Sequence, residues 1–257
     1  MTTHSWDPTH YLSYADERGR PFHELMARVA SRAPERVVDL GCGPGNLTVG
    51  LAERWPDAQV LGVDSSAEMI AAAPQHPRAR FEVRDLRDWV AVAEPVDVLV
   101  SNATLQWVPG HLDLLPALAS RVGPGGWLAV QVPGNFGEPS HTIRAELAAD
   151  SRYAGHLLDV AVPSSHEPVD YLRALAPLGF EVDAWETTYL HVLRGRDAVY
   201  DWVTGTGARP TLQALPEGLR EEFAAELRAR LAAAYPETEV GVLLPFRRIF
   251  VVGRRVR

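Results

Sequence analysis

The sequence contains no lysine, so all 25 of its basic residues are arginine. A chain without lysine cannot form a Schiff base with a cofactor, which excludes pyridoxal-type chemistry. It also cannot form a Walker A P-loop, whose signature requires a lysine. Arginine is instead suited to binding carboxylates, because its planar guanidinium presents pairs of parallel N–H donors.

Cysteine and long apolar runs are also scarce. Cys42 is the single cysteine, which excludes an intrachain disulfide. We interpret Cys42 as a small residue that fills a turn, since no His/Asp partner motif marks it as a nucleophile. The N-terminal residues are polar and lack the apolar core of a signal peptide, and the longest apolar runs are too short to span a membrane. We therefore predict a soluble, cytoplasmic protein with no membrane partner.

The charge balance is acidic, with 25 basic and 33 acidic residues and a formal net charge of −8. A general nucleic-acid-binding protein normally presents a basic face, so we predict no nucleic-acid partner. The chain has 257 residues, of which 46% are hydrophobic. This is enough for one large domain or for a core domain that carries a cap.

Apolar runs of strand length alternate with helical segments in the first half of the chain. The predicted strands are residues 36–41, 58–64, 79–85, 96–103 and 127–133. Because each run is almost entirely apolar, both faces of the sheet should be covered, as in a parallel sheet. Roughly the first 135 residues are therefore predicted to form a doubly wound α/β unit.

The second half is less regular. Residues 151–168 have the composition of a loop, residues 180–193 alternate like a strand, and two helices are predicted within residues 197–236. We expect these helices to form a cap over the carboxyl edge of the sheet, where open α/β sheets bind ligands. The predicted organisation is a single domain over 1–257: a helical segment (1–33), a cofactor-binding core (34–135), the rest of the sheet with its cap (136–245) and a final strand (246–257).

A turn with three alternate glycines, Gly41, Gly43 and Gly45, joins the first strand to a helix. Glycine lets the backbone turn sharply and approach a ligand, and the following helix N-terminus offers unpaired N–H groups. Dinucleotide sites and S-adenosylmethionine sites share these features, so the turn by itself leaves both open.

Three neighbouring residues separate these two kinds of site. The dinucleotide fingerprint requires a glycine where this chain has Asn46. Asp39, two residues before Gly41, would repel a pyrophosphate but attract an ammonium or sulfonium group. Asp64, at the end of the second strand, suits the ribose of either cofactor. The first two observations favour S-adenosylmethionine.

Taken in order, these motifs resemble class I S-adenosylmethionine-dependent methyltransferases. They are D-x-G-x-G-x-G, the acid ending strand two, RDLRDW after strand three and SNA after strand four. The resemblance implies a doubly wound Rossmann-like α/β sheet with an antiparallel final strand and a helical cap, and S-adenosyl-L-methionine as cofactor. It implies cofactor-binding residues at Asp39, Gly41, Gly43, Gly45, Asp64, Ser65, Met69, Asp85, Leu86, Asn102 and Ala103.

The resemblance also implies a role for most of these residues. Asp39 and the first two glycines would surround the methionyl part, and Asp64 would bind the ribose. Met69 would pack near the adenine, whose edge Asp85 and the Leu86 amide would read. The SNA residues after strand four would lie along the methionine tail.

A closer resemblance, to the trans-aconitate 2-methyltransferase family, extends over nearly the whole chain. It rests on DLGCGPGN, NATLQWVPGH, EPSH, DWVTGTGARP, the terminal RRIFVVGRR and an N-terminal R-x-R-P, and it is poor over residues 151–168. That family is cytoplasmic and methylates one carboxylate of a tricarboxylate, giving a monomethyl ester. The resemblance therefore implies trans-aconitate or a close tricarboxylate as the small-molecule substrate.

Carboxylate methylation agrees with the residues that are present. A carboxyl group has a pKa of roughly 4, so it is ionised and nucleophilic at neutral pH and needs no general base. The enzyme has to align the reacting atoms and exclude water. We found no candidate base and no metal-ligand motif such as H-x-x-x-H or paired cysteines, so no metal is predicted.

An anionic substrate in an acidic protein requires compensating cations and donors. The predicted substrate-binding residues are Tyr11, Arg18, Arg20, Gln106, Trp107, His141, Arg209 and Arg248. Each has a competing structural interpretation: core packing for the aromatic residues, a helix start for His141, and a solvated surface position for any arginine. Further arginines weighed and not selected include Arg144, Arg196 and Arg247.

Three other functions stay open on the sequence. A related methyltransferase acting on carbon, nitrogen or a hydroxyl would depend less on arginine and more on a base. A nicotinamide-dependent oxidoreductase is opposed by Asp39 and Asn46. A cofactor-binding module without catalysis would leave the predicted cap and the substrate arginines unexplained.

Overall fold

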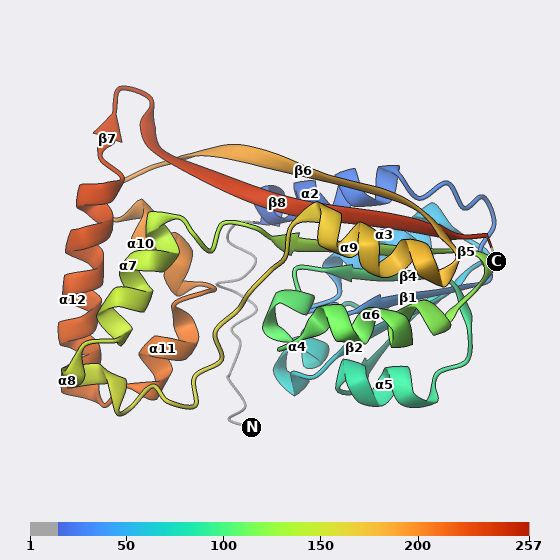
Figure 1. The fold of residues 1–257 in the computed structure, drawn as a ribbon, viewed down its shortest axis with the longest axis horizontal. Helices are drawn as coiled ribbons and strands as arrows, with labels where there is room; N and C mark the ends of the chain where they lie inside the picture. The colour runs from blue at the N-terminus through green and yellow to red at the C-terminus, as the bar shows by residue number, and fades with distance from the viewer. Residues whose placement is uncertain (1–14, 257) are drawn as a thin grey trace. The chain divides into compact units, whose positions relative to one another are not determined.

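The computed structural model describes residues 15–256 of the chain, and their side chains from residue 19 onward (Figure 1). Within these residues the chain forms two compact units. Unit 1 consists of Pro133–Ser164 and Thr188–Arg247, and unit 2 consists of residues 15–132, Ser165–Thr187 and the residues from Arg248. No helix among residues 15–256 is long and apolar enough to span a membrane.

The central sheet has the strand order β3-β2-β1-β4-β5-β8-β6, and the short strand β7 pairs with β8. Its strands are β1 (Arg36–Leu40), β2 (Gln59–Asp64), β3 (Ala79–Val83), β4 (Val96–Asn102), β5 (Val122–Pro133), β6 (Phe180–Leu193), β7 (Glu237–Thr238) and β8 (Gly241–Arg255). Strands β1 to β5 pair in parallel. The order reverses between β1 and β4, and open α/β sheets bind ligands at the carboxyl ends of strands beside such a reversal.

The final strand is antiparallel, as predicted. A Cβ atom added at Gly241, the first residue of β8, would lie 2.7 Å from the carbonyl oxygen of Leu193, the last residue of β6. A Cβ atom added at Gly253 would lie 2.9 Å from the ring of Phe180, the first residue of β6. The strand starts at residue 241 rather than at the predicted 246, because the apolar alternation continues through the exposed Pro245.

In unit 2, helices cover both faces of the sheet. One face carries α5 (Leu86–Val92), α6 (His111–Ser120) and α9 (Pro168–Leu175), which share an apolar cluster with residues such as Leu40, Leu99 and Val130. The other face carries α3 (Asn46–Arg54), which bonds the opposite side of β1 through Thr48 and Asp39. Arg54 at the end of α3 donates to the Met26 and Val29 carbonyls, which ties α3 to the end of α2 (Ala15–Ala27).

The remaining short elements of unit 2 lie at the strand ends. Helix α4 (Ala67–Ala71) follows β2 and has Ser66 as its N-cap. The 3-10 turn η1 (Leu105–Trp107) follows β4, and η2 (Ala176–Leu178) precedes β6.

Unit 1 contains the two predicted helices of residues 197–236 and three others. Its helices are α7 (Pro139–Ala148), α8 (Ser151–Ala154), α10 (Ala198–Thr204), α11 (Arg209–Ala214) and α12 (Glu217–Ala234). The apolar seam of α12 is buried at Phe223, Leu227 and Leu231, and the helix packs on α7. Residues 151–168 are not entirely loop, because Asp150 caps the short helix α8 by accepting from the Arg152 amide.

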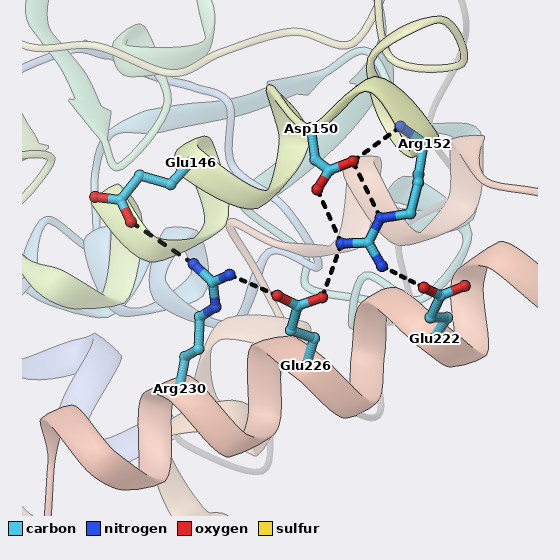
Figure 2. Close-up of polar contacts among 6 residues, drawn as sticks. All are labelled: Glu146, Asp150, Arg152, Glu222, Glu226 and Arg230. Carbon is cyan, nitrogen blue, oxygen red and sulfur yellow. Dashed lines mark hydrogen bonds and ion pairs between the residues drawn. The ribbon is translucent and has the colours of Figure 1, made fainter.

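A network of ion pairs joins the exposed sides of α7, α8 and α12 in unit 1 (Figure 2). Arg152 contacts Asp150 at 2.9 Å and Glu226 at 3.1 Å, and it also bonds Glu222. Arg230 contacts Glu226 at 2.5 Å and extends the network to Glu146 on α7. Ion pairs thus connect exposed side chains of α7, α8 and α12.

Candidate functional site

The glycine turn after β1 combines close packing with open space. Gly41 has a φ of 77°, and a Cβ atom at this position would lie 2.0 Å from Thr104 Oγ1. Gly43 has a φ of 55°, but a Cβ atom there would have no heavy atom within 4 Å. Gly45 follows as the N-cap of α3. Gly41 is therefore required by the fold itself, whereas Gly43 leaves its backbone open to a ligand.

Asp39 places a buried carboxylate beside this turn. Its side chain is 3% exposed, and its Oδ2 accepts a hydrogen bond of 2.7 Å from Thr48 Oγ1. Burial is the main cause that raises the pKa of Asp39 to about 6; the Thr48 bond opposes the shift and Asp64 adds to it. An ionised carboxylate in this position would be stabilised by a cation, which agrees with the predicted contact to an ammonium or sulfonium group.

Asp64 links the end of β2 to the same turn. Its Oδ2 accepts from the Gly43 amide and its Oδ1 from the Ser66 amide, both at 2.9 Å. Burial raises the pKa of Asp64, and the backbone bonds partly offset this effect. These bonds hold the carboxylate in one orientation, while its remaining lone pairs can accept from ligand hydroxyls.

The predicted adenine-site residues follow β2 and β3. Met69 is buried, Ser65 is exposed, and Asp85 is the N-cap of α5, accepting from the Arg87 amide at 2.8 Å. Leu86 is the first residue of α5, where helix amides lack intrahelical acceptors. All the predicted cofactor residues lie in unit 2, at the carboxyl ends of β1 to β4.

Three side-chain amides meet where β4 and β5 end. Asn102 pairs with Gln131 across the two strands, and the Ala103 amide, at a φ of 55°, donates to the Gln131 carbonyl at 2.8 Å. Gln106 Nε2 donates to the Ala103 carbonyl at 2.6 Å. Asn102 Oδ1, Gln106 Oε1 and both amide atoms of Gln131 are buried without a hydrogen-bond partner among the described residues. Such groups are rare in folded proteins, and these four atoms are available to a ligand or to water.

Gln131 was missed in the sequence analysis. It is fully buried on β5, and its neighbour Val130 belongs to the apolar cluster on the α5–α6 face. Gln131 therefore points to the opposite face, as Asp39 and Asn102 do. Arg248, which is 5% exposed, follows the same alternation on β8, because the next residue Ile249 is in the apolar cluster. A sequence signal existed: Gln131 is the only polar residue in the run WLAVQVP.

The predicted substrate residues are distributed over both units. Arg20, Gln106, Trp107 and Arg248 belong to unit 2, and His141 and Arg209 belong to unit 1. Arg20 lies on α2, has a side chain 66% exposed and contacts Glu24 at 3.2 Å; Trp107 is half-buried in η1. Tyr11 and the side chain of Arg18 lie outside the described residues.

In unit 1, His141 is half-buried on α7. One ring nitrogen lies 3.1 Å from Ser140 Oγ, and the ring packs edge-on against Phe136. Burial, together with the nearby charge of Arg144, lowers the pKa of His141 to about 4, so the ring is neutral at pH 7. Arg209 is the first residue of the short helix α11, which follows the end of α10 at Thr204.

Asn135 and Arg144 are two of the buried polar residues of unit 1, and neither was among the predicted substrate residues. Asn135 is 1% exposed, and neither amide atom has a hydrogen-bond partner among the described residues. Arg144 is 6% exposed, so the surface interpretation of this arginine is wrong. Ser140, Arg144 and Leu147 follow one another at helical spacing on the buried side of α7, a signal that the sequence already contained.

Comparisons with known proteins agree with the resemblance. The model of a family described as a methyltransferase domain matches residues 11–184. A trans-aconitate 2-methyltransferase of Streptomyces avermitilis is 51% identical, over 98% of this chain and 97% of that protein. A trans-aconitate 2-methyltransferase of Rhodococcus jostii is also 51% identical, over 97% of this chain and 99% of that protein.

Solved structures share the fold at low sequence identity. The YcgJ protein from Bacillus subtilis has a TM-score of 0.57 at 14% identity, over 92% of this chain and 99% of that chain. Geranyl diphosphate C-methyltransferase from Streptomyces coelicolor, solved with S-adenosyl-L-homocysteine, has a TM-score of 0.52 at 17% identity, over 93% and 77%. The fold is that of class I methyltransferases, and S-adenosylmethionine is the methyl donor. The chain belongs to the trans-aconitate 2-methyltransferase family.

Proposed function

We propose that this chain transfers a methyl group from S-adenosylmethionine to one carboxylate of trans-aconitate, or of a close tricarboxylate, and releases the monomethyl ester. One observation supports the assignment of the substrate. A relative named for this reaction is 51% identical along 98% of the chain, so the identity includes unit 1. Identity limited to the glycine turn and the sheet would support methyl transfer alone.

We propose that the residues at the carboxyl ends of β1 to β4 hold the cofactor. Asp39 and the backbone at Gly41 and Gly43 would surround the methionyl part, and Asp64 with Ser65 would bind the ribose. The open space at Gly43 and the two carboxylates support this assignment, because the ligand is a cation with free hydroxyls. When bound, the cofactor supplies an electrophilic methyl group on a sulfonium.

The other cofactor contacts are proposed from the strand ends. Met69, Asp85 and the Leu86 amide would contact the adenine, and Asn102 with Ala103 would lie along the methionine tail. The buried Asn102 oxygen without a partner supports the second assignment, since an ammonium group would satisfy it.

The proposed role of the substrate residues is to bind and orient carboxylates. They are Tyr11, Arg18, Arg20, Gln106, Trp107, His141, Arg209 and Arg248. Neutral His141 would donate one N–H without adding charge, whereas each arginine would offset a negative charge. The reacting carboxylate is already ionised, so proximity, orientation and exclusion of water are the chain's contributions to the rate.

The test measures release of S-adenosylhomocysteine with trans-aconitate, cis-aconitate, citrate and isocitrate supplied separately. We expect the fastest turnover on trans-aconitate and a product whose methyl group is released by mild base, as esters are. A base-stable methyl group would instead support transfer to carbon, nitrogen or a hydroxyl. Cofactor binding without turnover of any of the four acids would contradict the proposed substrate.

A pair of variants in unit 1 tests the cationic contact. Arg209→Gln should raise KM for trans-aconitate by roughly 10- to 100-fold, the usual effect of losing a charge-assisted hydrogen bond. Arg196→Gln removes the same charge from an exposed position of the same unit and should leave KM unchanged. Equal effects of the two variants would mean that only the overall charge of the protein matters.

A further inference from the structure

The ion pairs of unit 1 involve exposed arginines, whereas the buried Arg144 has no carboxylate partner among the described residues. Arg152, about two-fifths exposed, contacts three carboxylates, and Arg230 contacts two (Figure 2). Arg228, also exposed, contacts Asp197 at 3.3 Å. Arg144 is 6% exposed, yet no carboxylate of the described residues lies within 4.0 Å of its guanidinium.

The described neighbours that contact or lie near the Arg144 guanidinium are uncharged. Its Nη1 donates to Thr211 Oγ1 on α11 at 3.1 Å, and the nearby His141 is uncharged at pH 7. A guanidinium carries five N–H donors, and this hydroxyl accepts from one of them. Burial alone lowers the pKa of Arg144, with no acidic neighbour to oppose the shift. A buried charge without a counterion is strongly unfavourable, so an arginine retained here points to an anion supplied from outside the described residues.

We propose that Arg144 binds one carboxylate of the tricarboxylate substrate, and that Thr211 holds the guanidinium in the orientation needed for this contact. The inference rests on the proposed function and adds a residue to it. The planar guanidinium can hold a carboxylate through two parallel N–H···O bonds while Nη1 keeps its bond to Thr211. The substrate carboxylate thereby supplies the counterion that unit 1 lacks.

The experiment deletes the arginine and each substrate carboxylate in turn. Binding is measured by calorimetry to protein loaded with S-adenosylhomocysteine, so that no turnover occurs. The ligands are trans-aconitate and three dicarboxylates that each lack a different one of its carboxylates: mesaconate, itaconate and cis-glutaconate. Arg144→Gln should weaken trans-aconitate binding about 10- to 100-fold. It should also weaken the two dicarboxylates that keep the contacted carboxylate and leave the third unchanged, because the contact is already absent.

Matched variants separate this role from a structural one. Arg196→Gln removes an exposed arginine of the same unit and should bind all four ligands like the wild type. Thr211→Val keeps the charge and should weaken the same three ligands, by less than Arg144→Gln does. If Arg144→Gln does not fold, Arg144→Lys replaces it with the same expected ligand pattern, since lysine keeps the charge but not the two parallel bonds.

The outcomes distinguish the two proposals. If the wild type turns over trans-aconitate and Arg144→Gln binds all four ligands normally, or all four equally weakly, the role of Arg144 is overturned and the proposed function stands. If the wild type binds S-adenosylhomocysteine but not trans-aconitate, the proposed function fails and the inference fails with it.

Discussion

The glycine turn of unit 2 and helix α7 of unit 1 place ionisable groups of opposite sign away from solvent, although unit 2 also buries Arg248 on β8. Unit 2 holds the carboxylates Asp39 and Asp64 beside the glycine turn, and unit 1 holds the guanidinium of Arg144 next to a neutral His141. The proposed ligands have the complementary charges, because the methyl donor is a cation and the substrate an anion. A buried charge is costly unless a partner offsets it, and the ligand proposed for each of these groups would supply that partner.

The units also differ in how firmly these groups are held. Asp64 is fixed by two backbone amides and Asp39 by Thr48, all at 2.9 Å or less. Arg144 has its bond to Thr211 at 3.1 Å, and Asn135 has no hydrogen bond from its amide group to any described residue. The two carboxylates are therefore oriented by the fold itself, whereas Asn135 of unit 1, like Asn102 and Gln131 of unit 2, has buried amide atoms with no partner among the described residues. This contrast is the basis of the predictions below.

The largest effect is expected from the glycine turn. Gly41→Ala should lower the free energy of unfolding by about 3 kcal/mol or more, because a Cβ atom would overlap Thr104 at a φ of 77°. Gly43→Ala should lower the free energy of unfolding by only about 1–2 kcal/mol. This is the cost of holding alanine in the left-handed backbone conformation, and no clash adds to it because the space around Gly43 is open. The substitution should nevertheless abolish S-adenosylhomocysteine binding. Denaturant unfolding measures the stability of both variants, and calorimetry measures their S-adenosylhomocysteine binding. Normal binding by a folded Gly43→Ala variant would show that the cofactor does not occupy the open space at Gly43.

An intermediate effect is expected from Asp39. Its pKa of about 6 in the fold lies above the ordinary 3.8, so the ligand-free folded protein binds this proton more tightly than the unfolded chain. Asp39 therefore makes stability fall as pH rises between about 4 and about 6. A cationic ligand favours the ionised form, so S-adenosylmethionine affinity should fall as pH drops below about 6, by up to about tenfold per unit.

Asp39→Asn is the matched control for this pH dependence. The variant should bind S-adenosylmethionine about 10- to 100-fold more weakly at pH 7, having lost a charge-assisted contact. Its affinity should also no longer change through the range governed by the Asp39 pKa. Calorimetry at a series of pH values measures both quantities. An unchanged pH profile in the variant would show that another group is responsible and that Asp39 does not contact the cation.

The smallest effect is expected from the exposed ion pairs of unit 1. Arg152→Gln removes contacts to Asp150, Glu222 and Glu226, so Tm should fall slightly and the difference should shrink at high salt. Arg230→Gln, which removes two contacts, should lower Tm by less. Neither variant should change S-adenosylhomocysteine binding. Thermal unfolding at low and high salt measures the effect, and a loss that is independent of salt would point to packing on Tyr153 instead.

Local sequence patterns were sufficient to predict much of the structure of unit 2. The alternation of apolar strands and helices, the glycine turn, and acids at the ends of β1 and β2 are determined by residues close to one another along the chain. Backbone geometry makes such patterns informative, because a strand has period two and a turn with positive φ favours glycine. The α/β fold class could therefore be predicted from local pattern. The antiparallel final strand and the family were implied by the resemblance of the motifs, taken in order, to known methyltransferases.

Only the tertiary structure decided the environment of the buried polar groups. The helical spacing of Ser140, Arg144 and Leu147 was visible in the sequence, but the burial of this side of α7 depends on helices such as α11, whose Thr211 lies 67 residues beyond Arg144. Gln131 became part of the site only when β5 paired with β4 and placed it beside Asn102. The energy of a charge or an amide depends on what surrounds it in space, and segments distant in sequence supply those surroundings.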